Sequence, residues 1–337
     1  MPGQAARLRG GTGEPAGNPR TRGIGPLRKL PGECSSNPDR KAGASELWRS
    51  RKIRGIRAGE SVHNRMTTFS KKLARSFRGS IAQLCVGLDP DLHKIPNDLR
   101  NAKRPIFEFN KRVVDSAKNH CKIFKPQAAF YHAVGAEDEL ADTIRYIREE
   151  VPDSFVILDA KRGDVGHTSK MYALEAFDRY GADAVTVNPF LGLDCIEPFI
   201  EREDRGAIIL CKTSNPGSGF LQDMHVDGNM LFEKVAAEAE ELWQDKQNVM
   251  LVVGATFPRE MSLTRKAAPS VPFLVPGIGS QNGSLASSIR NGRSSVSPNS
   301  LIISASRSII YSGGGTPDGI EEAARRLSGE IAGYEAG

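Results

Sequence analysis

The stretch "ILDAKRGDVGHT", residues 157–168, begins as an apolar strand and then places Asp159, Lys161 and Asp164 in close succession. Burying charged side chains at the end of an apolar strand costs several kcal/mol per ion unless they are paired. Side chains two apart on a strand share a face, so Asp159 and Lys161 are expected to point the same way. The stretch therefore predicts a strand that carries a functional site at its carboxyl end.

Short β-rich apolar runs of this kind alternate with amphipathic segments along the rest of the chain. The predicted strands span residues 81–89, 121–127, 154–161, 183–189, 206–214, 248–256, 271–279 and 300–307. Helical patterns lie between them, for example at 105–119, 137–150, 231–243 and 319–331. Eight such units in about 250 residues predict an α/β fold, the (β/α)8 TIM barrel. An open doubly wound sheet is the alternative, but no GxGxxG motif follows the first strand.

The first 65 residues differ in composition from the rest of the chain. They hold 11 Gly and 6 Pro, with 14 of the 46 Lys and Arg and only 5 of the 40 Asp and Glu. Such a segment cannot bury enough apolar surface to offset its ordering entropy. Residues 1–65 are therefore predicted to be a disordered, dispensable basic tail before a barrel domain at 66–337. A targeting peptide and a nucleic-acid-binding arm are the alternatives.

The barrel domain is expected to begin with a helix in "MTTFSKKLARSF", residues 66–77. Thr67 or Thr68 can cap this helix, and Phe69, Leu73 and Phe77 recur on one side of it. The spacing predicts that this side of the helix is buried.

Charge and composition exclude several classes of protein. Without the tail, the chain carries 32 basic and 35 acidic residues, so it shows no positive excess suited to nucleic acid. No apolar run approaches the length of a membrane span of about 18 residues. The five Cys and six His show no metal-ligand spacing. A cytoplasmic protein with buried free thiols, no metal and no cofactor is the expectation.

Five charged residues are expected to converge at one end of the barrel, where active sites of this fold lie. They follow or end three predicted strands: Asp89, Lys125, Asp159, Lys161 and Asp164. A single ion pair there would equally well be a structural plug. Five charges from three strands indicate a use, because burying them together is costly.

A Gly-rich stretch and a following stretch that carries Arg307 predict a phosphate site. "PGIGSQNG" (276–283) and "SASRS" (304–308) end the last two predicted strands. The loops after strands seven and eight often hold phosphate in this fold, because backbone N–H groups can approach the anion there. Arg307 offers a planar donor fork for it. "TSNPGSG" (213–219) is predicted to be a long loop after strand five.

In "LDAKRGDVGHT" the sequence resembles the Asp-x-Lys-x-x-Asp signature of the orotidine 5′-phosphate decarboxylase family, in its longer, bacterial-type branch. Further motifs agree in order: "GLDP" (87–90), "FKPQAAFY" (124–131), "CKTSNPGSG" (211–219), "VPGIGSQNG" (275–283) and "SRSIIY" (306–311). The resemblance spans about residues 69–335. It implies a homodimeric, cofactor-independent carboxy-lyase that converts orotidine 5′-monophosphate to UMP, the last step of de novo pyrimidine synthesis.

The resemblance also implies a role for each matched residue. Lys161 corresponds to the proton donor, and Asp159 to the group that faces the substrate carboxylate. Asp89 and Lys125 correspond to residues that bind ribose hydroxyls within the charge network.

The remaining matched residues correspond to the dimer interface and the two ends of the substrate. Asp164 and Thr168 match residues that reach into the neighbouring subunit's site. Ser214 matches the residue that hydrogen-bonds the pyrimidine edge. The implied phosphate grip consists of backbone at Gly279, Gln281 and Arg307.

Two alternatives stay open on the sequence. A sister barrel family of hexulose-phosphate synthase type resembles the same motif but uses a Mg²⁺ enediolate. Its second strand offers the metal a carboxylate, whereas Lys125 stands at that place here, and a cation repels Mg²⁺. A non-catalytic barrel that binds phosphate or RNA through the basic tail is the other alternative.

Overall fold

The computed structural model describes residues 66–278 and 283–334, and within them eight parallel strands form a closed barrel. The predicted tail at 1–65 lies outside the described residues. The barrel strands are β1 (Ala82–Leu88), β2 (Ile123–Pro126), β3 (Phe155–Arg162), β4 (Ala184–Val187), β5 (Gly206–Lys212), β8 (Val249–Val253), β9 (Phe273–Pro276) and β10 (Leu301–Ala305). The predicted (β/α)8 barrel is confirmed.

The barrel closes because β1 pairs with both β2 and β10. Cys85 of β1 lies opposite Ile123 of β2, and Ala82 lies opposite Leu301 of β10. The observed strands end within three residues of the predicted ends, and the largest differences are at β8 and β9. Of the polar residues expected at the strand ends, Asp89 lies in the loop just beyond β1, whereas Lys125 and Lys161 lie within β2 and β3.

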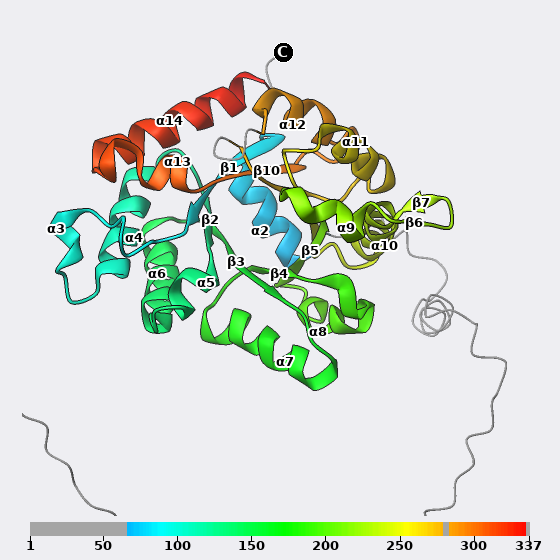
Figure 1. Ribbon diagram of the computed structural model, residues 1–337, viewed down its shortest axis with the longest axis horizontal. Coiled ribbons are helices and arrows are strands. Elements are labelled where there is room, and N and C mark those ends of the chain that lie inside the picture. The colour runs from blue at the N-terminus through cyan, green and yellow to red at the C-terminus, as the bar shows by residue number, and fades with distance from the viewer. Residues whose placement is uncertain (1–65, 279–282, 335–337) are drawn as a thin grey trace, which may run out of the picture. The chain divides into compact units, whose positions relative to one another are not determined.

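Helices form an outer ring around the strands, as Figure 1 shows. The longer ones are α4 (Pro105–Ala117), α6 (Glu137–Glu150), α7 (Gly166–Leu174), α10 (Leu231–Lys246), α11 (Pro258–Ala267), α12 (Leu285–Gly292) and α14 (Pro317–Gly333). The shorter ones are α3 (Asn97–Arg100), α5 (Ala128–His132), α8 (Glu197–Ile200), α9 (Gly219–Gln222) and α13 (Arg307–Ile310). The four helices predicted from periodicity are confirmed as α4, α6, α10 and α14. Among the described helices, none is both long and apolar enough to cross a membrane.

A short hairpin interrupts the connection between β5 and α10. Its two strands, β6 (His225–Val226) and β7 (Asn229–Met230), pair antiparallel and stay outside the barrel. The hairpin follows α9, so the loop after β5 is the most elaborate connection that leads from a barrel strand to its helix.

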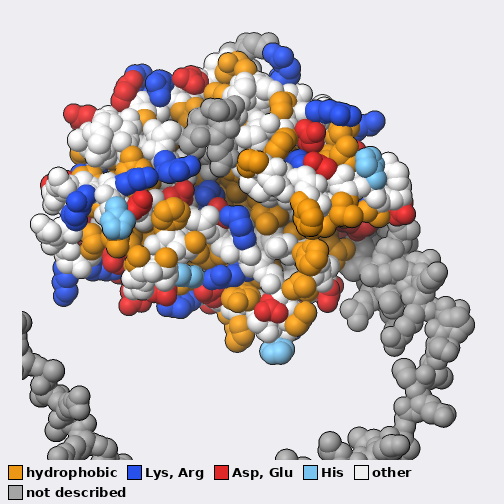
Figure 2. Space-filling model, viewed as in Figure 1, with side chains coloured by type: hydrophobic (Ala, Val, Ile, Leu, Met, Phe, Trp, Pro, Cys, Tyr) orange, Lys and Arg blue, Asp and Glu red, His pale blue; other side chains and the backbone are white. Residues whose placement is uncertain are grey.

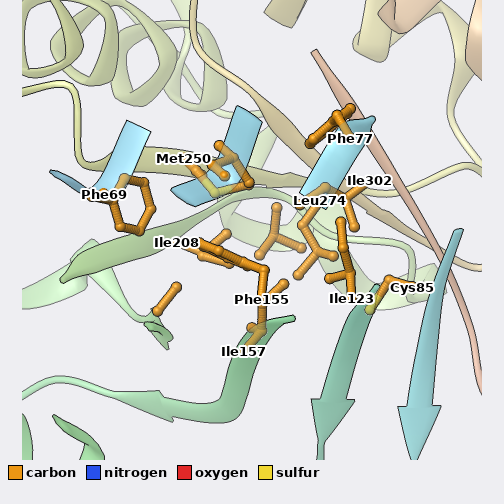
Figure 3. Close-up of a cluster of buried hydrophobic side chains, with 13 residues drawn as sticks. Phe69, Phe77, Cys85, Ile123, Phe155, Ile157, Ile208, Met250, Leu274 and Ile302 are labelled. Carbon is orange, nitrogen blue, oxygen red and sulfur yellow. The ribbon is translucent and has the colours of Figure 1, made fainter. Parts of the chain in front are cut away.

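Helix α2 (Thr68–Phe77) closes the amino-terminal end of the barrel and crosses the middle of the ring in Figure 1. The hydroxyl of Thr67 accepts a hydrogen bond from the Ser70 amide at 3.2 Å, which confirms the predicted cap. Phe69 and Phe77 point toward the inward-facing side chains of the strands (Figure 3). A Cβ on Gly206 would lie only 2.5 Å from the Phe69 ring, so this glycine makes room for it.

The same end of the molecule holds one buried carboxylate. Asp183, just before β4, is fully buried and pairs with Lys72 of α2 and with Arg148 of α6. It also accepts a hydrogen bond from the Val156 amide at 2.7 Å. These contacts join α2 and α6 to the sheet, and none of these residues lines the large cavity at the opposite end.

Candidate active site

A cavity of about 560 Å³ opens at the carboxyl ends of the strands. Figure 2 shows a hollow near the middle of the molecule, where Lys or Arg side chains meet apolar ones. The predicted residues found in its lining are Asp89, Lys125, Asp159, Lys161, Ser214 and Arg307. The barrel thus brings together side chains that are more than 200 residues apart in the chain, as its topology predicts.

Asp159 is the centre of the charge network. Its Oδ2 lies 2.9 Å from Nζ of Lys125, and its Oδ1 lies 2.6 Å from Nζ of Lys161. Asp159 and Lys125 are buried, whereas the Lys161 side chain keeps 47% of its surface exposed. Lys161 therefore reaches from a buried anchor into the open part of the cavity.

Two neutral residues that sequence reasoning missed complete the shell around Asp159. Gln127 donates from Nε2 to Oδ2 at 3.0 Å, and Thr186 donates its hydroxyl to Oδ1 at 2.9 Å. The Thr186 hydroxyl also accepts from the amides of Ala160 and Lys161, at 3.0 and 2.9 Å. A polar residue within the buried strand β4 was a usable signal for Thr186, because buried hydroxyls require partners.

Asp159 and Lys125 stabilise each other in their charged forms. Burial by itself would raise the pKa of Asp159, but the ammonium groups of Lys125 and Lys161 outweigh it and hold that pKa well below its usual range. Burial likewise disfavours the charged form of Lys125, but Asp159 and then Asp89 hold its pKa above its usual range. The site is therefore a preorganised set of alternating charges rather than a group of neutral acids and bases.

The backbone at Lys161 departs from regular strand geometry. The register between β3 and β4 shifts between Leu158 and Arg162, and Lys161 has a left-handed φ of 48°. The two charges meet as predicted, but through this irregularity and not through simple alternation along a strand. Non-glycine residues in this conformation are uncommon and concentrate at functional sites.

Two buried oxygens in the cavity lining have no hydrogen-bond partner among the described residues. They are Oδ1 of Asp89 and Oγ of Ser218. Buried polar atoms in native structures nearly always have partners, so unpaired ones facing a cavity indicate where a ligand binds. Asp89 was expected to contact ribose, which stays a prediction, whereas Ser218 was not predicted.

Of the three residues predicted to bind phosphate, the structure describes only Arg307. Arg307 begins α13 and lines the cavity near Gly277 and Ile278. Gly279 and Gln281 lie outside the described residues. The charge network and Arg307 thus line one cavity.

Asp164 and Thr168 are absent from the cavity lining of their own chain. Oδ1 of Asp164 accepts a hydrogen bond from the Val165 amide at 2.7 Å, and Thr168 lies in α7. Their assignment to a neighbouring subunit's site stays a prediction.

Comparison with known proteins identifies the family. Residues 82–319 match the model of the "Orotidine 5′-phosphate decarboxylase / HUMPS family". The orotidine 5′-phosphate decarboxylase of Cellvibrio japonicus is 45% identical over 263 residues, which cover 77% of this chain and 95% of that protein. The corresponding protein of Dechloromonas aromatica is 46% identical over 246 residues, 73% of this chain and 91% of its own.

A solved structure agrees with these relatives. Leishmania donovani OMP decarboxylase superposes with a TM-score of 0.69 at 35% identity, covering 81% of this chain and all of that one. The resemblance predicted from the sequence motifs is confirmed. This chain belongs to the orotidine 5′-phosphate decarboxylase / HUMPS family.

Proposed function

We propose that this protein is a cytoplasmic, cofactor-independent carboxy-lyase that converts orotidine 5′-monophosphate to UMP, and that residues 66–337 form its catalytic barrel. One observation carries the proposal: Nζ of Lys161 is held 2.6 Å from Asp159 at the wall of a cavity that Arg307 also lines. The site thus combines a fixed ammonium with a cationic group suited to phosphate. The curated relatives carry the name of this decarboxylase.

Lys161 is the group that meets the charge created by the reaction. When the bond to the carboxylate breaks, carbon dioxide leaves and the electron pair stays on the ring carbon. The Lys161 ammonium stabilises this developing carbanion and then transfers a proton to it, which forms the C–H bond of UMP. The neutral amine recovers a proton from water, to which its exposed side chain has access. Preorganised charge of this kind is often the largest catalytic contribution.

The rest of the network keeps Lys161 ready for that step. The Asp159 carboxylate holds the ammonium of Lys161 in position through their ion pair, while Gln127 and Thr186 hold that carboxylate in place. We assign to Asp159 the further role of facing the substrate carboxylate. Binding of the remote phosphate by Arg307 supplies energy that orients the ring at the other end of the cavity.

We also propose a homodimer in which Asp164 and Thr168 complete the partner's site. The segment that carries them also exposes three apolar side chains, those of Val165, Met171 and Leu174. Phe190 and Leu191, after β4, are exposed as well. An apolar face of this kind marks an association surface.

Mixing two inactive variants tests the shared site. Lys161→Ala and Asp164→Ala subunits each lack a different group, so a hybrid dimer regains one intact site. Random exchange of subunits should restore about a quarter of the wild-type activity, because half of the dimers are hybrids with one site of two. Absence of any recovery, with exchange verified by native mass spectrometry, would show that Asp164 acts within its own chain.

The magnesium-dependent sister activity is the main alternative. Nζ of Lys125 lies 2.9 Å from Asp159, so an ammonium occupies the position where that chemistry needs a metal-binding carboxylate. The deciding experiment follows the absorbance change from orotidine monophosphate to UMP with purified full-length protein. We expect turnover that EDTA does not reduce. Turnover of a hexulose phosphate, lost with EDTA, would instead establish the sister activity.

RNA binding by the basic tail is the remaining alternative. Salt-dependent RNA binding by the full chain, without decarboxylation, would establish it. Decarboxylation that persists after deletion of residues 1–65 would confirm that the tail is dispensable.

A further inference from the structure

One ion pair beside the cavity has no part in the mechanism above. Lys212 ends β5 and is among the largest fully buried side chains, with 1% exposure. Its Nζ lies 2.6 Å from Oδ1 of Asp223, which directly follows α9, and 4.5 Å from the centre of the Phe257 ring. A buried lysine with a carboxylate and an aromatic partner is costly to assemble, which indicates a positional role.

The pair encloses the part of the chain that forms one wall of the cavity. The two partners are 11 residues apart, and we call the segment between them, residues 213–222, the wall loop. Eight of its ten residues line the cavity: Thr213, Ser214, Asn215, Gly217, Ser218, Phe220, Leu221 and Gln222. The ion pair thus joins the two ends of a segment that contributes about a third of the lining.

The near end of the wall loop has other supports. Thr256 donates its hydroxyl to the carbonyl of Ser214 at 2.9 Å, and the Gly254 amide donates to the carbonyl of Lys212 at 2.7 Å. A Cβ on Gly254 would lie 2.6 Å from Cα of Ser214, so the glycine admits the loop against β8. This end is fixed to the barrel without help from the ion pair.

Polar contacts tie the far end to the near end, and the Met224 carbonyl next to it accepts from the Leu231 amide of α10 at 2.8 Å. Helix α9 has only four residues, and Phe220 within it is 91% exposed, so this end gains little from apolar packing. Oε1 of Gln222 accepts from the Thr213 amide at 3.0 Å, and Asp223 provides the ion pair. A Cβ on Gly219 would lie 2.7 Å from Oδ2 of Asp223, so this position leaves space for the carboxylate.

We propose that the Lys212–Asp223 pair is a positioning element for substrate binding, which holds the far end of the wall loop so that the unpartnered hydroxyl of Ser218 faces the nucleotide. The inference rests on the proposed function. Because the wall contacts the substrate before and during the reaction, loosening it weakens ground-state and transition-state binding alike. Such a loss raises KM and leaves kcat unchanged.

Steady-state kinetics of the full-length protein with orotidine monophosphate test this role. We expect Asp223→Asn to raise KM about tenfold with kcat within about twofold of wild type. If the unpaired lysine destabilises that variant, Lys212→Met/Asp223→Asn removes both charges and should show the same increase in KM. The matched control is Asp227→Asn, which breaks the exposed Lys234–Asp227 pair outside the cavity lining and should leave both constants unchanged.

The outcomes separate the two proposals. An active wild type with unchanged KM in both wall-loop variants, or a loss confined to kcat, overturns the positioning role. A wild type that does not decarboxylate orotidine monophosphate rejects the proposed function instead. Hydrogen exchange of the Thr213 amide then decides on the wall loop alone: faster exchange in Asp223→Asn supports the ion pair as its anchor, and unchanged exchange overturns it.

Discussion

The two ends of the barrel use the same eight strands for opposite purposes. At the amino-terminal end, Phe69, Leu73 and Phe77 of α2 fill the interior with apolar side chains. At the carboxyl end, Lys125 and Asp159 bring buried charges into an open cavity. The first arrangement gains free energy by removing apolar surface from water. The second arrangement costs free energy, because it holds buried charges beside the cavity, and the apolar packing offsets that cost.

The difference shows why each end responds differently to substitution. The apolar end tolerates no loss of volume without a cost in stability, because its side chains have no other interactions to make. The charged end depends on pairing, since Asp159 and Lys125 stabilise each other in their charged forms. Variants at one end should therefore change stability and spare the chemistry, whereas Lys161 should do the reverse.

The largest expected effect is on the chemistry at the charged end. Lys161→Ala removes both the fixed ammonium and the proton donor, so kcat should fall by at least about 10⁴-fold. Because Lys161 is half exposed, thermal unfolding of the variant should stay close to that of wild type. Single-turnover measurements with orotidine monophosphate check the first expectation. A variant that retains substantial activity would refute the proposed mechanism.

The next effect belongs to the apolar end. Phe69→Ala removes a fully buried ring that packs edge-to-face on Phe155 with centroids 5.4 Å apart. The free energy of unfolding should drop by about 3–5 kcal/mol. Urea denaturation measures the loss, and Phe69→Leu, which keeps most of the volume, should cost less. The folded fraction should decarboxylate at the wild-type rate, and a lower kcat at full folding would show that the two ends are coupled.

Asp159→Asn tests how much a charge at the site contributes to the free energy of unfolding. The variant leaves Lys125 buried beside a neutral amide, which should lower the free energy of unfolding by about 3 kcal/mol at neutral pH. The folded pKa of Asp159 lies below its usual value near 4, so its contribution is present above about pH 4 and is lost as pH falls through the folded pKa.

The difference between wild type and Asp159→Asn should therefore narrow with acid. The raised pKa of Lys125 keeps this side chain charged in alkaline solution. Its contribution to the free energy of unfolding is lost only as pH rises through a folded pKa above about 10. Urea midpoints of both proteins between pH 7 and pH 3.5 measure the trend. A difference that stays constant down to the lowest pH would mean that Asp159 is not stabilised as an anion.

Much of this contrast was predictable from sequence, because both ends have periodic or clustered signals. The capped helix with Phe69 and Leu73 on one side was confirmed, and Asp159 and Lys161 lie together as expected. The left-handed backbone of Lys161 was not predictable, because it depends on the shifted register against β4. The Lys212–Asp223 pair lies across an aperiodic loop, where sequence spacing carries no information about contact.

The smallest expected effect comes from Thr186, whose hydroxyl supports Asp159 and the backbone of Lys161. Thr186→Val keeps the shape but removes the hydroxyl that donates to Asp159 and accepts from the amides of Ala160 and Lys161. We expect a loss of about 1–2 kcal/mol in the free energy of unfolding, because two amides lose their acceptor. Since those amides fix the backbone of Lys161, kcat should fall about tenfold while KM stays unchanged. Thr186→Ser, which retains the hydroxyl, should recover most of kcat. If Thr186→Val lost stability with an unaltered kcat, the position of Lys161 would be set by its ion pair with Asp159 alone.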